Sequence, residues 1–177
     1  MIERAQHLSI LYTASLNGQI NLLPRLFTGI KRERSAAADA GRTVVLVDLG
    51  QSCRADAPPC AMTGGRAMLV AMDAMGYDAY HIGALDMLYA QPALVAQLRN
   101  VVMTHFAAGP WHVDIRRRDV LIRLANAQQL DPAAVPGDER ADLVVGLRLA
   151  DTEEIHVQYA GQERILWLQG AASTGDV

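Results

Sequence analysis

One segment, residues 42–50 with the sequence RTVVLVDLG, most constrains how this chain can fold. It is a continuous run of β-branched and aliphatic residues that ends in glycine, which is typical of an interior strand covered on both faces. Residues 8–13 predict a second buried strand. Between the two, residues 22–38 predict a helix with Pro24 in its first turn, where the missing N–H costs no hydrogen bond. Strand, helix and strand in this order indicate a βαβ crossover and a parallel sheet.

The alternation continues after a loop that contains Pro58 and Pro59. Residues 64–76 predict a helix that ends at Gly76, and its methionines are expected to fill the core. The face of this helix that we expect to be apolar consists of Ala67, Val70, Ala71, Ala74 and Met75. Residues 77–83 then predict a strand, which extends the parallel sheet.

A short helix over residues 91–99 and a fourth strand over residues 100–106 complete this pattern. The pattern then changes, because residues 111–115 and 119–125 are apolar alternating segments on either side of three arginines. They predict an antiparallel hairpin that opens a second sheet. The arginines, residues 116–118, indicate a solvated hairpin turn, with an anion-binding patch as the alternative.

The last third of the chain predicts a loop over residues 126–140 and buried strands over residues 141–149 and 163–170. Residues 151–160 leave helix and strand open, because Asp151 could cap a helix while IHVQY has strand propensity. With 177 residues, 51% of them hydrophobic and 20% charged, the chain is expected to form one globular domain over residues 1–177, with its core at about 8–173.

The overall charge and the hydropathy pattern exclude several classes of partner. A net charge of −3 lacks the basic excess that nucleic-acid binding needs. No apolar run approaches the ~20 residues that cross a bilayer, and the first residues lack the apolar core of a signal peptide. We therefore expect a soluble, cytoplasmic protein that binds neither nucleic acid nor membrane.

Cys53 and Cys60 are the two cysteines of the chain. In a cytoplasmic protein such a pair is usually present as free thiols, which is the expectation here, with a disulfide or a metal site as the alternative. A spacing of six residues matches no zinc pattern by itself.

The turns that follow the predicted strands carry the most information about function, because ligands of open α/β sheets gather there. These turns read TASLNG, LGQSC, IGALD, THF, LRLA and LQGAAS. In this order and spacing they resemble the calcineurin-like metallophosphoesterases, most closely the catalytic domain of the bacterial 5′-nucleotidases. The framework residues that carry the resemblance are Thr13, Leu16, Gly18, Asp48, Gly50, Ala74, Gly76, Tyr77, Asp78 and Gly83. The resemblance implies an α/β/β/α sandwich of two mixed sheets, truncated relative to the family.

The same resemblance implies where the family binds its two divalent metals. The corresponding positions of this chain hold Ser15, Asn17, Gln51, Ala84, Leu85, Leu149 or its neighbour Arg148, Ala171 and Ser173. Neutral side chains of this kind are weak metal ligands or none. We therefore expect no catalytic residues, no metal and no other cofactor. Asp48, Asp86 and His105 are the polar groups that we expect to remain in the cleft.

Three functions are compatible with this pattern. The first is a non-catalytic phosphoesterase-like protein that serves as a binding or structural subunit, with a protein partner or a second copy bound at an exposed sheet edge. The second is an enzyme that uses a different arrangement, drawn from Asp86, His105, Cys53 or the arginines. The third is a sensor of nucleotides or other small ligands.

Overall fold

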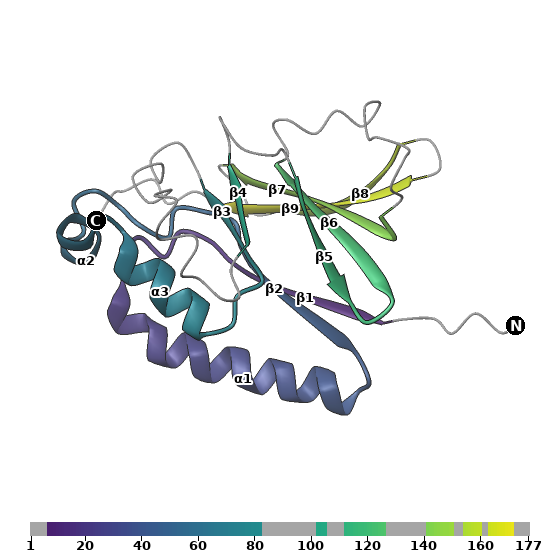
Figure 1. The fold of residues 1–177 in the computed structure, drawn as a ribbon, viewed down its shortest axis with the longest axis horizontal. Helices are drawn as coiled ribbons and strands as arrows, with labels where there is room; N and C mark the ends of the chain where they lie inside the picture. Colours follow the sequence, from purple (N-terminus) through teal and green to yellow (C-terminus); the bar gives the residue numbers. More distant parts are fainter. Residues whose placement is uncertain are drawn as a thin grey trace, which may run out of the picture.

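The computed structural model describes residues 7–82, 102–105, 112–126, 141–150, 154–160 and 163–171. Two sheets and three α-helices make up this part of the chain (Figure 1). The first sheet has the order β1-β2-β3-β4 and is parallel throughout its described strands. Its strands are β1 (Leu8–Thr13), β2 (Thr43–Asp48), β3 (Ala79–Ile82) and β4 (Val102–His105).

The helices follow β1 and β2 along the chain. A short 3-10 turn, η1 (Ile20–Leu22), leads into α1 (Leu23–Asp39), which has Pro24 in its first turn as expected. Two shorter helices, α2 (Pro58–Thr63) and α3 (Arg66–Ala74), lie between β2 and β3. No helix in the described part of the chain is long and apolar enough to cross a membrane.

The second sheet is mixed and has the order β5-β6-β7-β9-β8. The predicted hairpin is confirmed, because β5 and β6 pair antiparallel around a turn at Arg118 and Asp119. The open assignment at residues 151–160 is also settled, since residues 154–160 form a strand antiparallel to β9. The strands are β5 (His112–Arg117), β6 (Val120–Asn126), β7 (Leu143–Ala150), β8 (Glu154–Ala160) and β9 (Glu163–Ala171).

Two apolar clusters define the layers. The first packs the helices against one face of the first sheet and includes Ile30, Leu46 and Met72. The second lies between the two sheets and includes Val45 and Leu124. Figure 1 shows the same arrangement, with α1 and α3 on one side of β1–β4 and strands β5–β9 on the other. The expected α/β architecture with two stacked sheets is therefore present.

The outer face of the second sheet is buried along part of β6. Side chains alternate along β6, so Arg123 and Ala125 point away from the cluster that contains Ile122 and Leu124. Arg123 and Ala125 are nevertheless only 3% and 0% exposed. Both faces of this sheet are thus covered at its centre.

One prediction about the helices was wrong, and another is confirmed only in part. Pro58 and Pro59 open α2 instead of standing in a loop, because proline is compatible with the first turn of a helix. Of the face predicted for this helix, Met75 is buried and Ala71 packs against the core, but Val70 is 48% exposed. The buried residues within α3 itself are Met68, Leu69 and Met72. The core-filling role of the methionines is confirmed. The helix expected over residues 91–99 lies outside the described residues.

A candidate site at the carboxyl ends of β1 and β2

The turns that follow β1 and β2 run side by side beyond the strands themselves. In the strands, Thr13 is paired with Asp48. The pairing continues through backbone hydrogen bonds in which the N–H groups of Ser15, Asn17 and Gly18 donate to the C=O groups of Gly50, Gln51 and Ser52, over N···O distances of 2.9, 2.9 and 2.8 Å. The two turns therefore form one unit.

Three of the predicted site residues meet in this unit. Ser15, Asn17 and Gln51 have φ angles of 55°, 51° and 55°, a left-handed conformation that non-glycine residues rarely adopt. The Ser15 hydroxyl donates to Gln51 Oε1 over 3.2 Å, and the Asn17 side-chain amide donates to the Ser15 carbonyl over 2.9 Å. The structure therefore brings these three positions together.

Asp48 lies beneath the turns and is fully buried. Its Oδ2 accepts a hydrogen bond from the Thr13 hydroxyl over 2.5 Å, and its Oδ1 accepts from the Gly50 N–H and the Ser52 hydroxyl over 2.9 and 2.7 Å. A buried carboxylate needs such donors, because an unpaired charge in the interior is costly. The carboxylate thus holds the ends of both strands together, instead of facing a cleft.

Tyr77 extends this buried network. Its hydroxyl lies 3.0 Å from Thr13 Oγ1, and the side chain is fully buried. Burial is the main cause that raises the pKa of Tyr77 far above its ordinary value, and the nearby charge of Asp48 acts in the same direction. The phenol therefore stays neutral and serves as a structural hydrogen-bonding group.

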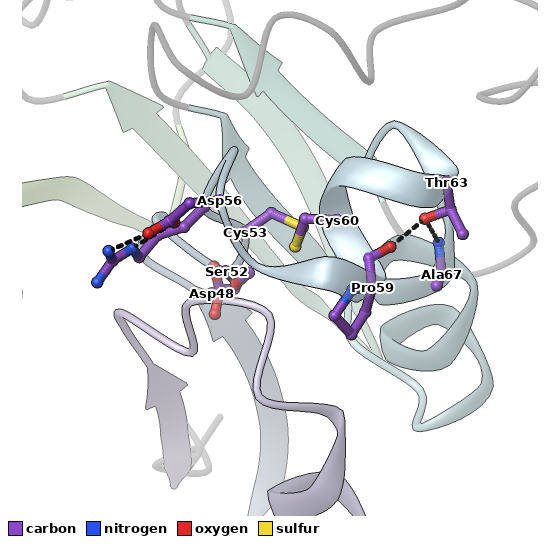
Figure 2. The surroundings of a disulfide bond; sticks show 9 residues. Asp48, Ser52, Cys53, Asp56, Pro59, Cys60, Thr63 and Ala67 are labelled. Carbon is purple, nitrogen blue, oxygen red and sulfur yellow. Dashed lines mark hydrogen bonds and ion pairs between the residues drawn. A yellow bond between two sulfur atoms is a disulfide. The ribbon is translucent and has the colours of Figure 1, made fainter.

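Cys53 and Cys60 form a disulfide, so the expectation of free thiols was wrong. The bond joins the loop after β2 to α2 across a Cα–Cα distance of 5.7 Å, and both residues are buried (Figure 2). The loop folds back because α2 begins at Pro58, two residues before Cys60. The sequence left the disulfide only as an alternative, since the helix that brings the cysteines together was itself missed.

Gly18 packs directly against this disulfide. Its φ is +76°, and a Cβ at this position would stand 2.7 Å from both Cys60 Sγ and Ala57 Cβ. Only glycine fits a site with that backbone angle and that little space. The β1 turn, the β2 loop and α2 therefore meet at Gly18.

The remaining predicted positions are placed only in part. Ala84, Leu85, Asp86 and Ser173 lie outside the described residues. His105 ends β4, while Leu149 lies near the end of β7 and Ala171 ends β9. Leu149 pairs with Gly170 in the parallel register of β7 and β9, so Leu149 and Ala171 lie close together at the carboxyl ends of these two strands.

The hairpin arginines are not a uniform solvated turn. Arg116 and Arg118 are exposed, but Arg117 forms an ion pair with Asp78. Asp78 also accepts the Leu46 N–H over 2.8 Å through its other oxygen. The pair therefore ties the hairpin of the second sheet to β2 of the first.

The described side chains do not fit a pair of divalent metals. Within the described ranges, no group of three or more His, Cys, Asp or Glu residues is placed to hold a metal ion. At the β1 and β2 turns the donors are a hydroxyl and two amides, which are neutral, and they hydrogen-bond to one another or to the backbone. Two dications held this way would lack the anionic ligands that offset their repulsion.

Comparison with solved structures supports the fold. The structure of Thermus thermophilus sulfate thiohydrolase SoxB in complex with glycerol matches 97% of this chain with a TM-score of 0.61 and 11% identity. The fold is metallophosphoesterase-like. The chain spans about half of the SoxB structure, 53% of its length.

A second comparison is weaker. An archaeal phosphodiesterase matches 93% of this chain and 82% of its own, with 7% identity and a TM-score of 0.43, which is too low to support an argument. No family model matches the chain, and no curated protein matches it in sequence. The likeness to SoxB concerns the fold alone.

Proposed function

We propose that this chain is a non-catalytic metallophosphoesterase-like protein that serves as a binding or structural subunit. One observation carries the proposal: Ser15, Asn17 and Gln51 stand together at the strand-end turns with neutral side chains that hydrogen-bond locally. Two-metal hydrolysis needs cations to activate water and to neutralise charge in the transition state. A set of neutral donors supplies neither the affinity nor the charge balance for such a centre.

The partner in this proposal is another protein or a second copy of the chain, bound at a sheet edge. Among the described strands, β1 and β4 end the first sheet, and β5 and β8 end the second. An open edge exposes backbone N–H and C=O groups that pair readily with another strand. Static light scattering of the purified protein distinguishes a second copy from a different partner.

Metal content and hydrolysis test the catalytic part of the proposal. The protein is purified with excess Mn²⁺, analysed by mass spectrometry for bound metal, and assayed on a nitrophenyl phosphate ester. We expect neither stoichiometric metal nor turnover. A variant with Ser15→Ala and Gln51→Ala, handled identically, is the matched control. Two bound metals with turnover in the wild type, both lost in the variant, would show that these turns form a working centre and would overturn the proposal.

A further inference from the structure

The disulfide lies at the point where three segments meet. It connects the loop after β2 with the first helical turn that follows, and Gly18 of the β1 turn packs against Cys60. Figure 2 shows the two cysteine side chains bridging the loop and α2, with Ser52 and Asp48 beside them. The residue before Cys53 is thus part of the buried Asp48 network.

The turn that carries the candidate site is attached to this same loop. Asn17 and Gly18 donate their N–H groups to Gln51 and Ser52, the two residues that immediately precede Cys53. Movement of the loop therefore moves the acceptors of both hydrogen bonds. The left-handed conformation of Asn17 and Gln51 depends on those contacts, because strained backbone persists only where its surroundings hold it.

Reduction cannot leave this arrangement unchanged. Bonded sulfurs are ~2.05 Å apart, whereas two non-bonded thiols need van der Waals separation, roughly 3.5–4 Å. A Cβ added at Gly18 would lie only 2.7 Å from Cys60 Sγ, so little free space remains on that side of Cys60, and the half-cystines are 4% and 2% exposed. Separation of the two sulfurs should therefore be accompanied by movement of the loop.

We propose that the Cys53–Cys60 disulfide is a redox-dependent clamp that holds the two strand-end turns in register. Closing the clamp removes two protons and two electrons from the two thiols. A low-molecular-weight disulfide accepts them by thiol–disulfide exchange and leaves as two thiols. This proposal does not depend on whether the protein is catalytic. It favours an oxidising compartment over the cytoplasm that we expected from the sequence.

Amide hydrogen exchange, read by NMR on the whole chain, tests the clamp. The ¹⁵N-labelled protein is measured after oxidation with oxidised glutathione and again in excess dithiothreitol. We expect exchange of the Asn17 and Gly18 amides to accelerate by about tenfold or more on reduction, because their acceptors move with the loop. The Leu46 amide, bonded to Asp78 in the centre of the sheet, is the internal control and should change by less than about twofold.

A variant with Cys53→Ala and Cys60→Ala should reproduce the fast exchange at Asn17 and Gly18 without any reductant. If that variant does not fold, the reduced wild type still decides the question. Unchanged protection at Asn17 and Gly18 after reduction would overturn the proposal. Equal loss of protection at Leu46 would also overturn it, since the bond would then stabilise the whole fold and not the turns. Detection of two free thiols in the protein after oxidation would also overturn the proposal, because the disulfide would then be absent.

Discussion

Replacing Gly18 by alanine tests whether the turn is held by the close contact with the disulfide. The added Cβ would lie 2.7 Å from Cys60 Sγ and 2.7 Å from Ala57 Cβ. Neither neighbour can move easily, because the sulfur is bonded to Cys53 and Ala57 directly precedes α2. The substitution therefore combines backbone strain with overpacking.

Two contributions set the expected loss of stability. An alanine in the left-handed region costs roughly 1–2 kcal/mol. Overpacking a well-filled site adds typically ~1–3 kcal/mol. The free energy of unfolding should therefore fall by about 2–5 kcal/mol, which lowers the Tm of a chain of this size by roughly 4–20 °C.

Gly41 provides a matched control. Its φ is +69°, and a Cβ there would meet nothing within 4 Å, so Gly41→Ala carries the backbone strain alone. Thermal and urea unfolding, followed by circular dichroism, should show Gly18→Ala to be less stable than Gly41→Ala by about 1–3 kcal/mol. In dithiothreitol this difference should shrink, because the loop is then released and can move away from Gly18. Equal destabilisation by the two substitutions in the oxidised protein would refute the reasoning.

Two further predictions concern pH. Burial raises the pKa of Tyr77 in the folded state, so the stabilisation from its neutral form is present below pH ~10 and is lost as the pH rises towards the folded pKa. Replacing Tyr77 by Phe should therefore flatten the fall in Tm between about pH 9 and 11. At pH 7 the same substitution should cost ~1 kcal/mol, because the contact with Thr13 is lost. Hydrogen bonds from Arg123, at 2.8 Å to each oxygen, are the main cause that lowers the pKa of Asp114. The stabilisation from the ionised Asp114 carboxylate is present above pH ~4 and is lost as the pH falls through the pKa of Asp114 in the folded protein. Asp114→Asn should therefore reduce the dependence of Tm on pH below about 4.

The parts of the fold that the sequence predicted correctly are those with a strong local pattern. The strand over Leu8–Thr13 has the expected bounds, and the hairpin around Arg118 forms as its alternation indicates. The face of α3 was misjudged in part because residues 67–72 are all apolar, so periodicity cannot select the buried side. Contacts with the first sheet and α1, both distant in sequence, determine which face of α3 is buried.

The candidate site likewise contains features that the sequence predicts and features that depend on tertiary packing. The residue types at Ser15, Asn17 and Gln51 could be read from the sequence, and so could their convergence, since parallel strands place their carboxyl ends together. The disulfide could not be read in this way. It depends on a helix that starts at Pro58 and on the space opposite Gly18, and both are properties of tertiary packing.

The backbone of the candidate site points to a requirement that its side chains do not explain. Asn17 tolerates the left-handed region, but Ser15 and Gln51 have no such preference, and the conformation costs an ordinary residue roughly 1–2 kcal/mol. The described contacts that offset this cost are the paired turns, the buried Asp48 network and the disulfide beneath Gly18. None of them requires a charged group facing outward from the turns. These strand-end turns can therefore keep their left-handed backbone while carrying neutral residues, which is the arrangement that the proposed function needs.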